Sequence, residues 1–568
     1  MKESILSIAA LAASCALAGT YTHTTYTGSD TNLKSLAVVS DGKFVLGTGD
    51  YSDSEWGDTK ERIYDGVTEL QDGEKVVYRW FEPGWVNGDT GDTACNWAGY
   101  QTQSPVVVTH ISFITRHDNY AERARGCRFE GANTADFSDA VALYTVPADA
   151  DVETLKAGWV EVDVAGAALS SPFTYLRVVA DDKYCGNFIE VEFYGKTWAD
   201  ATSGTPSAAP QNLTISSVDA DMDAVTLTWD APTEPCCSAK VIRSTAPGGS
   251  TFDVTLATLS ATTLTYTDSD AARIPGVTYY YRVAFANEDN VGPASEAVSH
   301  RHVVQLERTS LSDTSLKSGM SAIFYDWDNE TGALAFDGNV ATFADINAHD
   351  GYKTNITIGV DLGAEYVVTG FKVYPRTHNN LGERANGAYL ARSSDASDIS
   401  NRSWAANPVA LSPEMTGIAA SEETWYTFST TNRTPCRFIY LMKPTNPDFY
   451  GNVAELALYG YTLASSQSVL LAPENAAAEW HGTGAVITWT AGQNAASYQV
   501  ERKADGGDWT VVAQGLTEQQ YVDRPERPTK VGYIYRVASV DGNGGLAYTI
   551  SITPTGTPAA PGLAITIR

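Results

Sequence analysis

The chain has 568 residues, a formal net charge of −30 and a pI of about 4.5. This length is too great for one hydrophobic core and fits roughly four domains. The negative charge repels nucleic-acid phosphates and anionic lipids, so we expect no nucleic-acid partner and no membrane insertion. An abundance of Thr, Val and Ser favours strands over helices.

The N-terminal segment has the pattern of a secretory signal peptide. An apolar run that is too short to span a bilayer ends at Ala16-Leu-Ala18, a typical small-residue cleavage site. We therefore expect residues 1–18 to be a signal peptide, and the mature protein to be secreted or held at the cell surface.

Two large repeats follow, at residues 20–197 and 304–462. Both contain short stretches in which apolar and polar residues alternate, such as Val106–Phe113 and Val367–Tyr374, separated by Gly, Asn and Asp. This pattern predicts a jelly-roll β-sandwich in each large repeat.

Two matched motifs support the duplication. The sequence Phe-Ile-Thr-Arg that ends at Arg116 is matched by Val-Tyr-Pro-Arg, which ends at Arg376. The segments Gly186–Gly195 and Gly451–Gly460 both begin with Gly-Asn and end with Tyr-Gly. Repeated units suit binding, because two weak sites on one chain reinforce each other.

A small repeat follows each large one, at residues 205–300 and 466–555, and residues 556–568 form a C-terminal tail. Strand-like alternation leads to Trp229 in the first small repeat and to Trp489 in the second. Both repeats then contain Tyr-x-Tyr-Arg-Val. The predicted fold class is all-β, with two large sandwiches alternating with two small ones.

The order Pro, Trp and Tyr-x-Tyr-Arg-Val in the small repeats resembles the fibronectin type III family. The resemblance implies a sandwich of about 90 residues, in which the Trp fills the core and the Tyr anchors a corner through its hydroxyl. It implies that Trp229 and Trp489 are core residues, not ligand platforms, and that the small repeats are spacers.

The second large repeat contains, in order, Asp337-Gly-Asn339, Asp361-Leu-Gly363, Arg376, Asn386-Gly387 and Glu455. This order resembles the discoidin domains, also called F5/8 type C domains, and the family-32 carbohydrate-binding modules, which share a galactose-binding-like jelly roll. The first large repeat departs from this pattern. It has Tyr64-Asp65-Gly66, but Leu70 stands where Thr is expected, and a Trp-rich stretch at 79–100 replaces the Asp-Leu-Gly strand, which we expect to be missing.

The discoidin resemblance implies a structural Ca²⁺ ion between the Asp-Gly-Asn loop and the late Glu. Hard cations of this kind take oxygen ligands. The matching residues of the second repeat are Asp337, Asn339, Thr342 and Glu455, and those of the first are Asp65 and Glu190.

The same resemblance implies a sugar site on the loops. A sugar needs an aromatic face for its C–H side and planar polar groups for its hydroxyls. The candidates in the second repeat are His349, Arg376, Asn386 and Tyr450, a set similar to those that bind galactose or N-acetylhexosamines. The candidates in the first are Arg116, His117 and Arg125. The alternatives are that Arg376 braces a loop, His349 is a surface residue and Tyr450 packs in the fold.

The sequence lacks His-Glu-x-x-His, Gly-x-Ser-x-Gly and Walker motifs, and small β domains account for all four segments. We therefore expect a secreted, non-catalytic protein that binds extracellular glycans. The alternatives are a structural cell-surface or adhesion protein that binds other proteins, and an accessory subunit of a glycan-degrading complex.

Export would permit disulfide bonds. Two of the three residues Cys95, Cys127 and Cys185 could form one, and Cys236 and Cys237 either form a vicinal disulfide or stay reduced.

Overall fold

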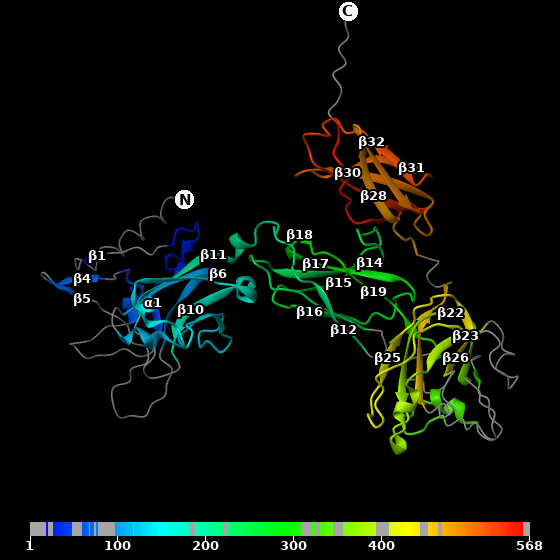
Figure 1. Ribbon diagram of the computed structural model, residues 1–568. Coiled ribbons are helices and arrows are strands. Elements are labelled where there is room, and N and C mark those ends of the chain that lie inside the picture. The colour runs from blue at the N-terminus through cyan, green and yellow to red at the C-terminus, as the bar shows by residue number, and fades with distance from the viewer. Residues whose placement is uncertain are drawn as a thin grey trace, which may run out of the picture.

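The computed structural model describes residues 19–20, 26–47, 60–66, 69–72, 75–77, 97–116, 119–180, 188–219, 224–307, 321–323, 330–344, 356–393, 408–443, 453–463 and 469–559. Antiparallel sheets dominate these residues, and the helices are short (Figure 1). The all-β prediction is confirmed. No helix in the described ranges is long and apolar enough to cross a membrane.

Large domain 1 (residues 31–197) contains an eight-stranded sheet with the order β2-β11-β6-β10-β7-β8, and β3 and β9 also pair with β6. Its strands are β2 (Thr31–Asn32), β3 (Val45–Gly47), β6 (Trp97–Thr115), β7 (Arg128–Ala132), β8 (Val141–Thr145), β9 (Trp159–Asp163), β10 (Phe173–Val179) and β11 (Phe188–Thr197). Its short helices are η2 (Leu33–Leu36), η3 (Lys60–Tyr64), η4 (Asn119–Ala124), α1 (Val152–Lys156) and η5 (Gly166–Ser170), and α2 (Trp198–Ala201) follows directly after β11 at the end of the domain. A separate sheet pairs β1 (Gly19–Thr20), β4 (Glu69–Asp72) and β5 (Lys75–Val77).

Large domain 2 (residues 304–461) repeats this topology with the order β20-β27-β22-β26-β23-β24, and β21 and β25 also pair with β22. Its strands are β20 (Val304–Gln305), β21 (Ser321–Ile323), β22 (Ile356–Pro375), β23 (Tyr389–Ser393), β24 (Val409–Ala410), β25 (Tyr426–Ser429), β26 (Cys436–Met442) and β27 (Val453–Tyr461). Its helices are η6 (Glu330–Phe336), η8 (His378–Asn380) and η9 (Gly382–Ala385).

The strand expected to be missing from the first large repeat is present. β6 spans 19 residues and β22 spans 20, so each runs through both halves of its sandwich. Val179 pairs with Trp97 in β6, and Phe438 pairs with Asp361 in β22. The sequence changed while the backbone pairing stayed, because the sheet needs a strand there and not a particular Asp-Leu-Gly sequence.

The two small domains are sandwiches of two sheets each. Small domain 1 (residues 214–301) contains β12 (Thr214–Val218), β13 (Val225–Thr228), β14 (Ser238–Ser244), β15 (Val254–Ser260), β16 (Thr265–Asp268), β17 (Thr278–Asn287), β18 (Asn290–Ala294) and β19 (Val298–Arg301). Small domain 2 (residues 474–548) contains β28 (Glu474–His481), β29 (Gly484–Thr490), β30 (Ser497–Ala504), β31 (Trp509–Leu516), β32 (Gln520–Asp523), β33 (Tyr533–Val540) and β34 (Leu546–Tyr548).

The core residues expected in the small domains are confirmed. Trp229 is 4% exposed and Trp489 is 6% exposed, each inside the apolar core of its domain. The buried Tyr281 donates its hydroxyl to Asp268 Oδ2 at 2.8 Å, and Tyr535 donates to Asp523 Oδ2 at the same distance. Each tyrosine thereby ties two strands of its domain together.

Small domain 1 touches all three other domains (Figure 1). Cys236 N donates to Ser170 Oγ of large domain 1 at 3.2 Å, and Arg301 Nη1 donates to the Tyr461 hydroxyl of large domain 2 at 2.6 Å. The segment 248–251 pairs with β34 of small domain 2, where Ser250 forms an antiparallel bridge with Ala547. Small domain 1 therefore contacts each of the other three domains, and the role of the small repeats as spacers stays a prediction.

The cysteines of the described residues are not bridged. Cys127 and Cys436 are buried thiols, and the vicinal residues Cys236 and Cys237 are not joined by a disulfide. Cys95 and Cys185 lie outside the described residues, so a bond between those two stays a prediction.

Candidate functional site

In both large domains the candidate residues lie at the same end of the sandwich. Arg116 directly follows β6, and Arg376 directly follows β22. The late glutamates face these strand ends, because Glu190 pairs with Ile114 and Glu455 pairs with Tyr374. The duplicated topology therefore brings an arginine and a buried glutamate to one end of each large domain.

In large domain 2 the four predicted cation ligands come together. The backbone N–H of Asn339 donates to Asp337 Oδ1 at 2.8 Å and to Glu455 Oε1 at 2.9 Å. Thr342 donates its hydroxyl to Asp337 Oδ2 and to the Asn339 carbonyl, at 2.7 Å in each case. Glu455 is 1% exposed. Two carboxylates, a hydroxyl and a backbone carbonyl thus meet where the 337–342 loop lies against β27.

This donor set is suited to a hard cation. Ca²⁺ takes six to eight oxygen ligands and accepts carboxylates, carbonyls and water together. The described residues contain no cluster of three or more His, Cys, Asp or Glu side chains placed for a metal. The charged ligands available here are therefore the two carboxylates of Asp337 and Glu455. Ca²⁺ would need Asp337, Glu455, Thr342 and the Asn339 carbonyl as ligands, with water completing its shell.

The corresponding loop of large domain 1 is poorer in oxygen ligands. The backbone N–H of Gly66 donates to Glu190 Oε2 at 2.9 Å, as Asn339 does to Glu455. Burial raises the pKa of Glu190 well above its usual range, the negative charge of Asp65 adds to this effect, and the positive charge of Lys34 opposes it. Asp65 and Glu190 are thus close together, but the position expected to hold Thr is Leu70.

Arg376 of large domain 2 lies against an aromatic ring that sequence reasoning missed. Its guanidinium carbon is 3.9 Å from the centroid of the Phe343 ring. The exposed His378 stacks on the same ring, with centroids 6.2 Å apart and planes 16° apart. Because Phe343 directly follows Thr342, it links the cation loop to Arg376. The available signal was an aromatic residue beside the Asp-Gly-Asn loop and a histidine two residues after the arginine.

Asn386 and Arg125 brace loops. Asn386 Nδ2 donates to the Ile418 carbonyl at 2.8 Å, and its Oδ1 accepts from Ile418 N at 2.9 Å. In large domain 1, Arg125 Nε and Nη2 donate to the Ala150 carbonyl at 2.9 and 2.5 Å. The same structural task is performed by an amide in one copy and by a guanidinium in the other. Ligand binding by these two residues stays a prediction.

Large domain 1 carries an arginine–tyrosine cluster beside Arg116. Tyr120 is 49% exposed, and the guanidinium carbons of Arg116 and Arg123 lie 4.8 and 4.3 Å from its ring centroid. Neither Tyr120 nor Arg123 was predicted from the sequence. The other predicted ligands, His117, His349 and Tyr450, lie outside the described residues.

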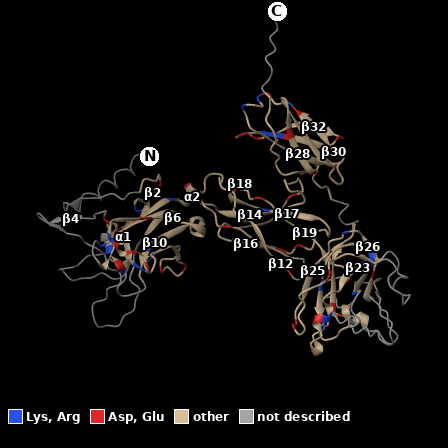
Figure 2. Ribbon diagram, viewed as in Figure 1, with Lys and Arg blue, Asp and Glu red and all other residues tan. Residues whose placement is uncertain are grey.

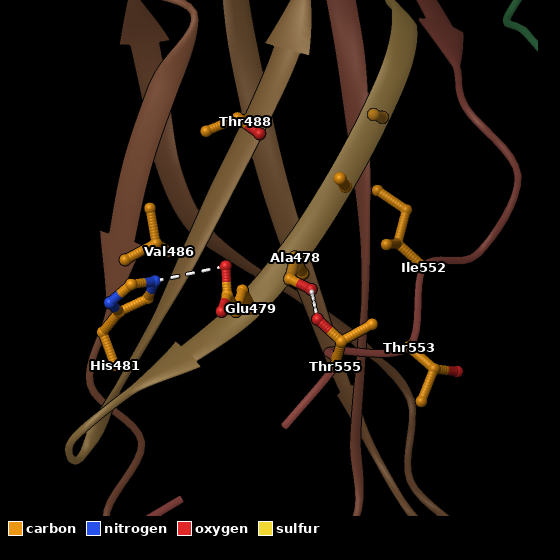
Figure 3. Close-up of a pocket in the computed structure, with 10 residues that line it drawn as sticks. Ala478, Glu479, His481, Val486, Thr488, Ile552, Thr553 and Thr555 are labelled. Atoms are coloured by element: carbon orange, nitrogen blue, oxygen red, sulfur yellow. Dashed lines mark hydrogen bonds and ion pairs between the residues drawn. The ribbon is translucent and has the colours of Figure 1, made fainter. Parts of the chain in front are cut away.

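A shallow groove of about 330 Å³ lies on small domain 2, between β28, β29 and residues 552–555 (Figure 3). In it, His481 Nε2 lies 3.3 Å from Glu479 Oε2, and the Thr555 hydroxyl donates to the Ala478 carbonyl at 3.3 Å. The lining residues include no Trp, Tyr or Phe. The groove therefore lacks the flat ring that a sugar site needs, and it is remote in sequence from the residues predicted to bind.

No protein-family model and no curated protein matches the chain. Solved structures that are similar to parts of it include the following three. CBM62 of Clostridium thermocellum Xyl5A is 27% identical over 27% of this chain and 94% of that chain, with a TM-score of 0.21. An Fn3-like protein from Clostridium thermocellum is 25% identical over 16% of this chain and 96% of that chain, with a TM-score of 0.14.

The third is a serum F-lectin (fucolectin) of Morone saxatilis, the striped bass. It is 12% identical over 76% of this chain and 99% of that chain, with a TM-score of 0.19. All three TM-scores lie below 0.5, so these likenesses support no assignment of site residues. The candidate sites rest only on the contacts and distances described above.

Proposed function

We propose that the chain is a secreted, non-catalytic protein that binds extracellular glycans through the loop ends of its two large domains. The observation that carries this proposal is the contact between Arg376, Phe343 and His378, next to the cation loop of large domain 2. The guanidinium carbon of Arg376 lies 3.9 Å from the Phe343 centroid, and the N–H donors of an arginine form a planar fork. Such a fork suits two adjacent sugar hydroxyls, and a histidine beside it supplies a further polar contact.

The proposed ligands are glycans that end in galactose or an N-acetylhexosamine. Ca²⁺ would have a structural part: it would hold Asp337 to Glu455 and so keep Phe343, and through it Arg376, in place. Its chemistry is limited to binding oxygen ligands. The residues of this chain would bind the sugar.

Isothermal titration of the full chain with galactose-, N-acetylgalactosamine- and N-acetylglucosamine-ended oligosaccharides tests this function. Loss of a hydrogen bond from a charged group costs about 1.5–3 kcal/mol, so Arg376→Ala should weaken binding about tenfold or more. The matched control is Arg437→Ala, because this 46% exposed arginine of the same domain pairs with Asp361 at 2.6 Å on another strand.

Equal affinity of wild type and Arg376→Ala would remove this site from consideration. Binding to extracellular-matrix proteins that none of the three sugars competes with would favour the adhesion alternative.

A further inference from the structure

We propose that the vicinal thiols of Cys236 and Cys237 are a site of reaction with small organic disulfides, and that the vicinal disulfide formed there loosens the junction between large domain 1 and small domain 1. The two cysteines directly precede β14 of small domain 1. They lie where this domain meets large domain 1, in the part of the molecule beside α2 (Figure 2). This inference does not depend on the sugar sites.

Cys236 is held between large domain 1 and the linker that joins the two domains. Its N–H donates to Ser170 Oγ at 3.2 Å, and the same hydroxyl donates to its sulfur at 3.9 Å. The sulfur lies 3.1 Å from the Glu234 carbonyl. The carboxylate of Glu234 in turn accepts from Ser207 N at 2.5 Å and from Ala208 N at 2.7 Å, in the linker.

Cys237 is tied to the linker as well. Its N–H donates to the Ala286 carbonyl at 3.2 Å and to Asn287 Oδ1 at 3.0 Å. The side chain of Asn287 is buried, and its Nδ2 donates to the Gly204 carbonyl of the linker at 2.9 Å. The backbone of the cysteine pair is therefore part of the contact between the two domains.

A disulfide between the two residues requires a different backbone from the one that makes these contacts. Disulfides usually join residues whose Cα atoms are about 4.4–6.8 Å apart, but the Cα atoms of adjacent residues are only about 3.8 Å apart across a trans peptide. Closing the bond would therefore turn the peptide between Cys236 and Cys237, and the N–H of that peptide is the donor to Ala286 and Asn287. Movement of the Cys236 sulfur would also end its contact with Ser170. A bond outside the usual geometry is easily reduced, so the reaction would be reversible.

The surroundings of the two sulfurs set the order of the reaction. Cys236 is 0% exposed, and burial raises the pKa of its thiol to about 11, whereas Cys237 is half-buried. The Cys237 thiolate would attack a small disulfide RSSR, form a Cys237–SR bond and release RS⁻. The Cys236 thiol would then lose its proton, and its sulfur would attack the Cys237 sulfur and release the second RS⁻. The two protons lost by the cysteines convert both leaving groups to RSH, so two thiols are oxidised and one RSSR is reduced.

The test treats the full chain with glutathione disulfide and follows it by mass spectrometry and hydrogen–deuterium exchange. We expect the peptide that contains both cysteines to lose two hydrogen atoms, and dithiothreitol to restore them. The amides of Cys236 and Cys237 should exchange about tenfold faster or more after oxidation, because each loses a hydrogen bond. The strands β14 and β17 should keep their protection.

Variants separate the roles of the two thiols. Cys236→Ser should stop with one glutathione attached to Cys237. Cys237→Ser should react about tenfold more slowly or less, because its remaining thiol is buried. Cys436→Ser, which changes a buried thiol in large domain 2, should be oxidised like the wild type. Before treatment, all three variants should show the amide exchange of the reduced wild type, which separates oxidation from damage to the fold.

Four results would overturn the inference. Glutathione disulfide could leave Cys236 and Cys237 unchanged, or the wild type could stop with glutathione on Cys237. The vicinal disulfide could form without a change in amide exchange. Oxidation could also expose β14 and β17 to exchange, which would show a loss of the whole domain and not a loosened junction.

Discussion

His302 is a buried residue at the point where the chain passes from small domain 1 into large domain 2. It is 2% exposed, and its Nδ1 has no hydrogen-bond partner among the residues that the structure describes. Its backbone is fixed, since its N–H donates to the Val277 carbonyl at 3.0 Å and its carbonyl accepts from Gly276 N at 2.8 Å. Burial lowers the pKa of His302 to about 4, and the positive charges of Arg273 and His300 add to the effect.

This histidine should make the junction sensitive to acid. Between pH 6.5 and 4 the unfolded chain binds a proton at this position that the folded chain does not bind, so stability falls as the pH is lowered through this window. At pH 5 the loss relative to pH 8 is about 2 kcal/mol for this one residue. His302→Gln should remove that part of the pH dependence, as measured by the thermal unfolding of small domain 1 at both pH values.

His481→Gln is the control for this experiment, because the His481 side chain is 62% exposed. A pH dependence that is the same in wild type and His302→Gln would contradict the prediction.

At the scale of elements, the loop from Asp337 to Thr342 shows what a sequence motif predicts well. Asn339 and Glu455 are 116 residues apart, yet the order of motifs placed both at one end of β22. The Asp-Gly-Asn motif predicts a backbone turn, and the late glutamate marks the strand that lies against this turn. The sheet order, which is the same in both large domains, brings the two together. The sequence could not separate bracing from ligand binding at Asn386 and Arg125, because the same polar groups serve a backbone carbonyl or a sugar hydroxyl equally well.

Phe343 and Tyr120 escaped prediction for a related reason. Aromatic residues fill cores far more often than they contact arginines at a surface. Arg376, the partner of Phe343, is also distant from it in the sequence, and Arg123, the partner of Tyr120, lies one turn further along the short helix η4. Only the folded backbone shows which ring meets which guanidinium.

Calcium should stabilise large domain 2 through this loop. At a free concentration about 100 times its Kd, a ligand that binds only the folded state adds about 2.7 kcal/mol to the free energy of unfolding. We expect Ca²⁺ to raise the melting temperature of the wild type and a chelator to reverse the change. Glu455→Gln should abolish the response, because it removes one of the two carboxylates.

Glu414→Gln is the control, since it makes the same substitution at an exposed position of large domain 2 outside the predicted ligand set. If Glu455→Gln still responds to Ca²⁺ as the wild type does, the ion binds elsewhere.

At the scale of the whole molecule, the unexpected feature is the pairing of small domain 1 with small domain 2. Gly248 N donates to the Tyr548 carbonyl at 3.0 Å, and Tyr548 N donates to the Gly249 carbonyl at 2.9 Å. Beneath this pairing lies a small apolar cluster formed by Ala246, Leu470, Ala472 and Ala547. Backbone hydrogen bonds and alanines leave almost no trace in a sequence, so the contact could not be foreseen.

Gly248 allows this close approach. A Cβ atom at this position would lie 1.8 Å from the Thr549 carbonyl oxygen, so the two segments could not stay in register. We expect Gly248→Ala to separate the small domains, which small-angle scattering would record as a larger radius of gyration. Sugar affinity at either large domain should stay the same.

Gly542→Ala is the matched control, because a Cβ atom at Gly542 meets nothing within 4 Å. An unchanged radius of gyration in Gly248→Ala would mean that the contact does not hold the small domains together in solution.

The contact between the small domains also decides how the protein would carry a mechanical load. Leu546 N donates to Thr251 Oγ1 across 295 residues of chain, and all of large domain 2 lies within that loop. Tension between the C-terminal end and a glycan gripped by large domain 1 would therefore pass directly from β34 to small domain 1. Large domain 2 would carry no tension until the hydrogen bonds between β34 and small domain 1 broke. The segment between Thr251 and Leu546 would then extend, and only after that would large domain 2 come under tension.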